Sequence, residues 1–330
     1  MHDDLFSSHI ARLALMMADH YVSALCFNDS ENLLGKYKDK HYSIYANTDW
    51  LEDGSKAYKQ QLDQHLIGVA IEAEKICRKL PIFQKSLPSL SQNSLLEQLI
   101  SKKEITQYPI LENFIWQNAC IKTAELVAKN TLQYGFFGIN MASTGLGKTR
   151  ANAKIMYTLG SETGSIRFNV ALGLRTLTLQ TGREFQTDLK IDKKDISITV
   201  GGISVKELFE KNEQMESATL HDNGSQSSED MLNSEYNTEY ETTYIQEHPL
   251  YTWTTKSNNK EKHRINKLIQ PPILVCTIDH LIPATEGIRG GQQIAPMLRL
   301  LTSDLILDEP DDFDLADLPA LSRLVHLAGL

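Results

Sequence analysis

The sequence predicts an α/β protein in which a mostly parallel, doubly wound sheet follows an all-helical region. Short apolar runs alternate with helical segments from about residue 111 onward. The residues before that point instead place apolar side chains at spacings of three and four, which is typical of amphipathic helices. Strands that alternate with helices favour a parallel sheet with helical crossovers. We therefore expect two parts, a helical region at 1–110 and an α/β domain at 111–330.

Composition sets the broad class of the protein. The chain has 330 residues, 41% hydrophobic and 23% charged, which is ordinary for a globular protein. Its net charge of −9 argues against a surface coated with nucleic acid but leaves room for a local basic groove. The four cysteines form no CxxC pair, and no apolar run approaches the ~20 residues that span a bilayer. We expect a cytoplasmic protein without a membrane segment.

The helical region is predicted in four pieces. Ser8 is a candidate N-cap for a first helix, and a polar loop is expected over about 28–55. A long amphipathic helix begins near Leu62, and Pro81 is expected to end it. Residues 84–110 are polar and Ser-rich, which predicts a linker or a loosely packed segment.

The α/β domain is predicted to open with a helix over 111–130 and a strand over 134–140. A glycine-containing loop and a helix over 149–159 follow. Further strands are expected at 166–174, 196–200, 273–278 and 304–309. The segment 211–267 is rich in Asn, Ser, Thr and Glu and has few apolar residues, so we expect a partly disordered surface insertion there.

The loop sequence MASTGLGKTR, residues 141–150, has the spacing of a phosphate-binding loop, with Ala142 in place of its first glycine. Glycines let the backbone approach a phosphate, and the lysine reaches the β- and γ-phosphates. The threonine hydroxyl then ligates magnesium. The alternative is a glycine turn with an exposed lysine. The residues expected to hold the nucleotide are Thr144, Gly145, Gly147, Lys148 and Thr149.

An acidic pair follows the last predicted strand, in SDLILDEPDD. We expect Asp308 to bind the magnesium ion and Glu309 to orient and deprotonate an attacking water, with Lys148 as the third catalytic residue. The second acid favours nucleotide hydrolysis over phosphate transfer to a metabolite, as in a P-loop kinase. The alternative for the pair is a solvated acidic turn.

Other residues suit the first RecA-like lobe of a superfamily 2 helicase. Gln117 lies upstream of the loop, where such lobes place a glutamine that recognises adenine. Residues at or after several strand ends are expected to contact the phosphates of a single nucleic-acid strand. For each of them alone, a turn or helix cap is an even alternative. They are Arg175, Gln180, Gly201, Gly202, Thr277, Asp279 and His280.

Four blocks of the sequence resemble the CRISPR-associated helicase–nuclease of type I-F systems. They are NMASTGLGKTRANAKIMYTL, ALGLRTLTLQTG, VCTIDHLIPATEGIRGGQQIAPMLRL and SDLILDEPDDFDLADLPALSRLVHLAG. The resemblance implies a RecA-like lobe that uses ATP and magnesium to move along single-stranded DNA during CRISPR interference. It also implies a CRISPR surveillance complex and adaptation proteins as partners.

The same resemblance extends to the helical region, which is similar to the end of an HD-type nuclease domain. LMMADHYVS matches a family motif whose aspartate ligates a transition metal, which implies that role for Asp19. QHLIGVAIEAEKI makes His65 a candidate second ligand, the alternative being a packed or surface histidine. Because proteins of this subtype are several times longer, we expect a fragment without the second helicase lobe. Its alternative function is a nucleotide-binding or interaction module without turnover.

Overall fold

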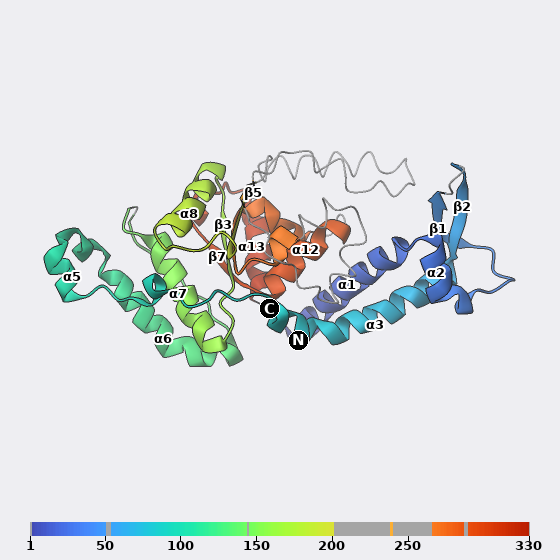
Figure 1. The fold of residues 1–330 in the computed structure, drawn as a ribbon, viewed down its shortest axis with the longest axis horizontal. Coiled ribbons are helices and arrows are strands. Elements are labelled where there is room, and N and C mark those ends of the chain that lie inside the picture. Colours follow the sequence, from blue (N-terminus) through green and yellow to red (C-terminus); the bar gives the residue numbers. More distant parts are fainter. Residues whose placement is uncertain are drawn as a thin grey trace.

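The computed structural model describes residues 2–50, 54–143, 145–200, 238–239, 266–286 and 290–329. The molecule is elongated: a sheet with its helices occupies the centre and one end, and a β-hairpin lies at the other end (Figure 1). The expected insertion at 211–267 lies almost entirely outside the described residues, as do Thr144, Gly201 and Gly202.

Two long helices, α1 (His2–Ser23) and α3 (Leu62–Ser86), pack against each other in the N-terminal region. The expected start at Ser8 is wrong, because the helix begins at His2 and Ser8 is exposed on its surface. The expected end at Pro81 is also wrong. Pro81 is exposed, whereas Phe83 beyond it is 1% exposed and packs in the core, which offsets the backbone hydrogen bond that proline removes.

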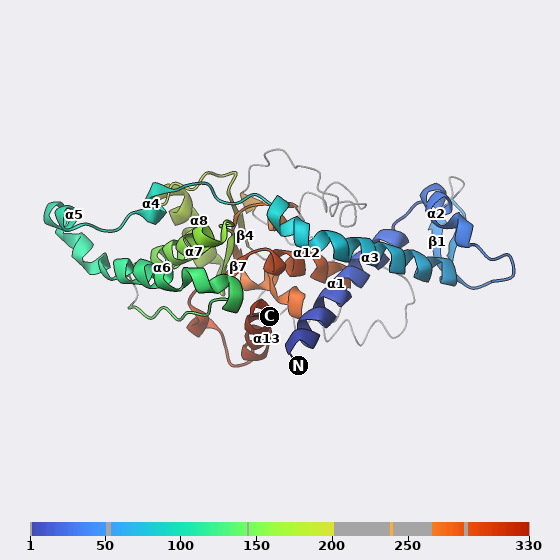
Figure 2. The same ribbon diagram turned by 90° about the horizontal axis from the view of Figure 1, so that it is seen from below.

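The segment expected as a polar loop holds secondary structure. It contains α2 (Phe27–Leu34), the 3₁₀ turn η1 (Gly35–Tyr37) and an antiparallel hairpin of β1 (Tyr45–Trp50) and β2 (Lys56–Gln61). Figure 2 shows this hairpin at the far end of α3 from the sheet. Most residues of these strands are polar, with Tyr45, Trp50 and Tyr58 as their aromatic residues, and this polarity concealed the strands in the sequence.

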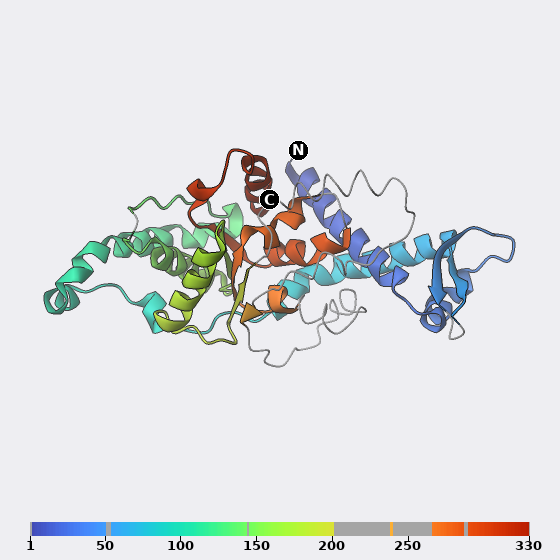
Figure 3. The same cartoon turned by 90° about the horizontal axis from the view of Figure 1, so that it is seen from above.

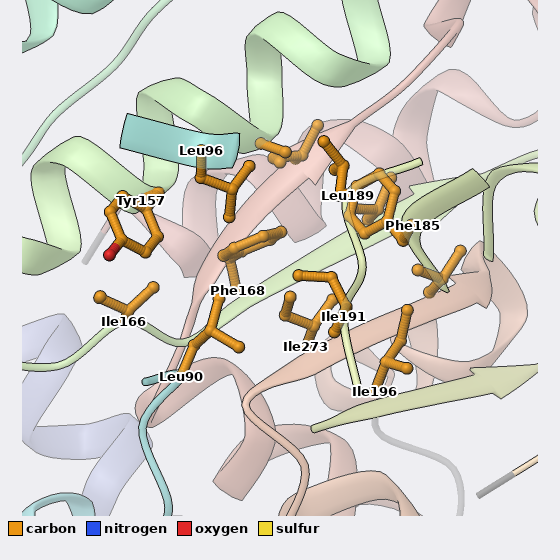
Figure 4. Close-up of a cluster of buried hydrophobic side chains, with 14 of the residues drawn as sticks. Leu90, Leu96, Tyr157, Ile166, Phe168, Phe185, Leu189, Ile191, Ile196 and Ile273 are labelled. Atoms are coloured by element: carbon orange, nitrogen blue, oxygen red, sulfur yellow. The ribbon is translucent and has the colours of Figure 1, made fainter. Parts of the chain in front are cut away.

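The expectation of a loosely packed segment at 84–110 is wrong as well. It forms α4 (Ser94–Glu97), α5 (Lys102–Gln107) and the 3₁₀ turn η2 (Pro109–Phe114). Leu90 and Leu96 are buried in the hydrophobic core of the sheet, beside Tyr157 and Phe168 (Figure 4). The amide N–H of Leu90 also donates to the carbonyl of Ile166 over 3.0 Å. Two well-placed leucines therefore tie this polar segment to the α/β domain.

The sheet confirms the predicted α/β class. Its order is β5-β4-β6-β3-β7, with four parallel strands and an antiparallel edge strand. Residues of β3 and β6 are buried throughout, as expected for a parallel sheet covered on both faces. The strands are β3 (Phe168–Leu172), β4 (Ile196–Thr199), β5 (Thr238–Glu239), β6 (Ile273–Thr277) and β7 (Asp304–Leu307).

Helices cover both faces of this sheet (Figure 3). On one face, α7 (Lys148–Thr163) and α8 (Arg175–Thr187) pack onto Phe168 and Val170. On the other, α13 (Leu318–Ala328) and the turns η4 (Ile278–His280) and η5 (Ile282–Thr285) pack onto Ala171 and Leu274. The remaining helices are α6 (Trp116–Tyr134) and α12 (Gly290–Leu301), with the short turn η6 (Pro310–Asp312) after β7.

The strand predicted at 134–140 does not form. α6 continues to Tyr134, and residues 135–143 have no regular secondary structure. Phe137 and Ile139 are 79% and 77% exposed. An apolar run becomes a strand only where a neighbour accepts its backbone hydrogen bonds, and no described strand pairs with this segment.

The N-terminal helices share a hydrophobic core with the α/β domain. Leu13 and Met17 of α1 belong to the same buried cluster as Met297 and Leu298 of α12. Arg12 Nη2 also donates to Gln293 Oε1 over 3.0 Å. The division at residue 110 thus stays a prediction, but the two parts contact each other through α12.

Among the described helices, none has by itself the length and apolar character to cross a bilayer. Only α1 and α2 taken together, bent by 120°, reach that apolarity. Since Leu13 and Met17 of α1 are buried against α3, this apolar character belongs to the protein core.

Candidate functional site

The glycine loop leads directly into α7. Gly147 is the N-cap residue of this helix, with φ 73° and ψ 39°, and Gly145 has φ 81°. Both lie in the left-handed region that favours glycine. α7 therefore begins at Lys148 with the unpaired N–H groups of its first turn adjoining the loop. This arrangement, a glycine loop at a helix N-terminus, favours a bound anion.

The first turn of α7 meets the carboxyl end of β7. Thr149 Oγ1 donates to Asp308 Oδ2 over 3.0 Å, although the two residues are 159 positions apart in the sequence. Asp308 is 5% exposed, and its amide N–H donates to the carbonyl of Ala171 in β3. The structure thus brings together a hydroxyl and a carboxylate oxygen, which are ligand types that magnesium prefers.

Glu309 adopts a strained backbone conformation directly after Asp308. Its φ of 52° and ψ of 54° are left-handed, and it precedes Pro310, which disfavours the right-handed helical region for the residue before it. Such a conformation costs a non-glycine residue about 1–2 kcal/mol. Strain of this kind concentrates at functional sites, and here it turns the chain sharply after the acidic pair.

Two side chains at the start of α6 donate hydrogen bonds to backbone carbonyls of the glycine loop. Gln117 Nε2 donates to the carbonyl of Gly147, and Trp116 Nε1 donates to the carbonyl of Leu146, each over 3.2 Å. Gln117 is 1% exposed. The structure therefore places Gln117 against the loop, as its position upstream of it suggested. Trp116 was missed by sequence reasoning, although an indole beside the glutamine was an available signal.

We predict that Gly147→Ala destabilises the protein more than Gly145→Ala. Both substitutions force alanine into the left-handed region, at about 1–2 kcal/mol each. At position 147 an added Cβ would also lie 2.7 Å from Gln117 Nε2, whereas at position 145 it would meet nothing within 4 Å. Urea unfolding should show a larger decrease in the free energy of unfolding for Gly147→Ala than for Gly145→Ala. In a protein that also carries Gln117→Ala, the difference between the two decreases should be smaller. Equal losses for the two variants would contradict this packing of the loop.

Only some of the residues expected to contact nucleic acid lie together at the carboxyl ends of the parallel strands. Arg175 follows β3 and is exposed, and Thr277 ends the neighbouring parallel strand β6. Asp279 and His280 follow in η4, half-buried. Because these strands are parallel to β7, their carboxyl ends share the sheet edge that carries Asp308. Gln180 lies farther along α8 and donates to Glu184 over 2.9 Å.

Asp19 and His65, the pair expected at a metal, come together where α1 packs on α3. His65 Nε2 lies 2.9 Å from Asp19 Oδ1, and His65 Nδ1 lies 3.0 Å from Gln60 Oε1 and 3.2 Å from Asn47 Nδ2. The hydrogen bond from His65 lowers the pKa of the Asp19 carboxyl. Within the described ranges, no group of three or more His, Cys, Asp or Glu side chains could hold a metal ion.

These features define an α/β protein with a glycine loop and an acidic strand end that meet beside a parallel sheet. No protein-family model matches the chain. It is 43% identical over 327 residues to the CRISPR-associated nuclease/helicase Cas3 subtype I-F/YPEST of Pseudomonas aeruginosa. It is 42% identical over 330 residues to the protein of the same description from Pectobacterium atrosepticum.

Each of these alignments covers 99% of the chain and 28% of the relative. The predicted resemblance to the type I-F CRISPR-associated helicase–nucleases is therefore confirmed, and the chain is homologous to a segment of these proteins. The likeness includes the helical region as well as the α/β domain.

Proposed function

We propose that the chain is the first RecA-like lobe of an ATP-dependent DNA helicase, preceded by the end of an HD-type nuclease domain. The parent enzyme would act in CRISPR interference against foreign DNA. The contact between Thr149 and Asp308 is the observation that carries the proposal. It joins the glycine loop to the acidic strand end, which is what a site for a nucleotide and its magnesium ion requires.

The residues present fit magnesium and ATP. Thr149 and Asp308 offer the oxygen ligands, and the first turn of α7 offers N–H groups and the Lys148 ammonium to the phosphates. Bound MgATP supplies the phosphoanhydride bond that is hydrolysed. Glu309 adjoins Asp308 and would orient the attacking water, while Gln117 remains the candidate for adenine recognition. Calorimetric titration with MgATP tests this assignment, and absence of binding would contradict it.

The same sheet edge supports the proposal of a DNA strand beside the nucleotide. Arg175 follows β3 and Thr277 ends β6, at the edge of the sheet where Asp308 follows β7. Arg175 would bind phosphate as an exposed cation, and the Thr277 hydroxyl would position the strand. Single-stranded DNA, a CRISPR surveillance complex and adaptation proteins are accordingly the proposed partners of the parent enzyme.

For the transition metal, the fit is incomplete. Asp19 and His65 supply one carboxylate and one imidazole, whereas a catalytic metal centre takes three or more protein ligands. The described residues bring no third ligand to the pair. We propose that Asp19 and His65 are part of the HD metal site of the parent enzyme and are not sufficient alone.

We predict that this chain does not cleave DNA with manganese, nickel or cobalt, because Asp19 and His65 alone bind such ions weakly. A plasmid-nicking assay measures the rate, with Asp19→Ala as the matched control for contaminating nuclease. Cleavage by the unmodified chain that disappears in Asp19→Ala would show that the metal site is complete.

A further inference from the structure

The hairpin of β1 and β2 exposes an aromatic surface at the end of the molecule farthest from the sheet (Figure 1). Trp50 and Tyr58 are each 67% exposed, and Tyr45 is 37% exposed. Tyr45 and Tyr58 stack with their ring centroids 4.7 Å apart and their planes inclined by 22°. Lys56 Nζ lies 4.7 Å from the centroid of the Trp50 ring. Four side chains, three rings and one ammonium, thus form what we call the aromatic platform.

Cross-strand pairing places three of these groups on one face. Trp50 pairs with Lys56, and Thr48 pairs with Tyr58, so that side chains two residues apart project the same way. Tyr45 lies beyond an irregularity in the register of β1 and joins them by stacking on Tyr58. The last residues of β2 contact α1 instead. Lys59 Nζ donates to the carbonyl of Ser23, and Gln60 Nε2 donates to the carbonyl of Val22. The hairpin is therefore fixed on its inner side, and its rings are presented outward without a hydrophobic core to explain them.

The inner side of this hairpin also contacts the proposed metal ligands. Asn47 Nδ2 in β1 lies 3.2 Å from His65 Nδ1, and Gln60 Oε1 in β2 lies 3.0 Å from the same atom. His65 in turn contacts Asp19. The hairpin thus carries the platform on one side and contacts the Asp19–His65 pair through Asn47 and Gln60.

We propose that the aromatic platform binds single-stranded nucleic acid by base stacking. This inference rests on the proposed function, since it takes the parent enzyme's substrate to be a single strand. Exposed rings beside a lysine are the elements of sequence-tolerant single-strand binding, in which bases stack and cations meet phosphates. Tyrosine and tryptophan faces accept any base, as a translocating enzyme requires.

The charge around the platform indicates a binding mode dominated by stacking. Lys56 is the cation of the platform itself, and the Asp49 carboxylate beside Trp50 accepts from the backbone N–H of Trp50 over 3.0 Å. The net charge of the chain is −9. A site that neutralises one or two phosphates of a single strand loses about three- to sevenfold in affinity between 50 and 200 mM salt. We expect that shallow dependence here.

The test is fluorescence anisotropy of a labelled oligothymidine titrated with the full chain, without ATP. Trp50→Ala and Tyr58→Ala should each weaken binding about tenfold or more, and Trp50→Phe should retain most of the affinity because it keeps a ring. Tyr108→Ala is the matched control, because Tyr108 is 55% exposed and directly follows α5, which lies at the opposite end of the molecule (Figure 1). Circular dichroism confirms that each variant is folded.

Several outcomes would overturn the proposal. One is an unchanged affinity for oligothymidine in the Trp50→Ala, Tyr58→Ala double variant. Another is a loss of affinity in Tyr108→Ala as large as that in the platform variants. A third is an affinity that depends on salt as steeply as that of a purely ionic site. A dimer that the double variant converts to monomer, with DNA affinity unchanged, would make this face a contact between two copies. Titration of the unmodified chain with MgATP reports on the nucleotide site separately, so failure of the platform and failure of the nucleotide site are distinguishable.

Discussion

Lys148→Ala should weaken the binding of MgATP about tenfold to a hundredfold. Lys148 is the first residue of α7, at the end of a loop whose two glycines adopt left-handed conformations. In the proposed site its ammonium would meet the β- and γ-phosphates, and a hydrogen bond to a charged group contributes about 1.5–3 kcal/mol. A loss of that much binding free energy corresponds to the tenfold to hundredfold change in affinity, because about 1.4 kcal/mol is a factor of ten in Kd. Isothermal titration calorimetry measures it.

A matched control separates this effect from a general loss of positive charge. Lys194 is half-exposed and lies 3.5 Å from Asp192, before β4 and away from the glycine loop. Lys194→Ala should therefore bind MgATP with unchanged affinity. Equal affinities of the Lys148→Ala variant and the unmodified chain would show that the loop is a glycine turn with an exposed lysine.

The second large effect concerns turnover: this chain should hydrolyse ATP barely above background. In two-lobed helicases the nucleotide lies between the lobes, and the second lobe supplies an arginine to the developing charge. Such an arginine contributes about 10³–10⁵ to the rate in related P-loop enzymes. Arg175 is exposed at the sheet edge proposed for DNA, so it is a poor substitute, and Arg289 lies outside the described residues. In the proposed site Glu309 would orient the water, but a carboxylate cannot replace that cation.

A steady-state ATPase assay with and without single-stranded DNA measures this rate. DNA should not stimulate it, because stimulation requires DNA to close two lobes on the nucleotide. Glu309→Gln is the control variant, since it keeps the shape of the side chain and removes the carboxylate. A rate of about 1 s⁻¹ or more, within the usual range for enzymes, that Glu309→Gln abolishes would show that the site is complete in this chain.

The central strands were predictable because burial on both faces leaves a continuous apolar run. Phe168–Leu172, Ile196–Thr199 and Ile273–Thr277 are each fully buried, and each is composed mainly of apolar residues. The glycine loop was predictable for a different reason. Gly145 and Gly147 have positive φ angles, which few other residues adopt. The presence of glycine at these positions in the sequence therefore indicated the conformation of the loop.

The failures came from segments whose structure depends on distant partners. The 135–143 segment is apolar, yet no described strand pairs with it, and it stays irregular. Leu90 and Leu96 lie in a polar stretch, but the sheet core accepts them. In the candidate site, the structure brings Thr149 to Asp308 and Asp19 to His65, all residues that the sequence had singled out, and their functional roles stay predictions. The support from Trp116 required knowing that α6 packs behind the loop.

The most direct test of the account is a double-mutant cycle on Thr149 and Asp308, read out as the magnesium dependence of ATP affinity. Thr149→Val removes the hydroxyl and Asp308→Asn removes the charge, while both nearly preserve side-chain shape. If the two oxygens jointly hold the magnesium ion, each single variant should lose most of the magnesium-dependent affinity. The double variant should lose little more, which gives a coupling energy of about 0.5–3 kcal/mol. Unchanged magnesium dependence in both single variants, or strictly additive losses, would contradict the proposed nucleotide site.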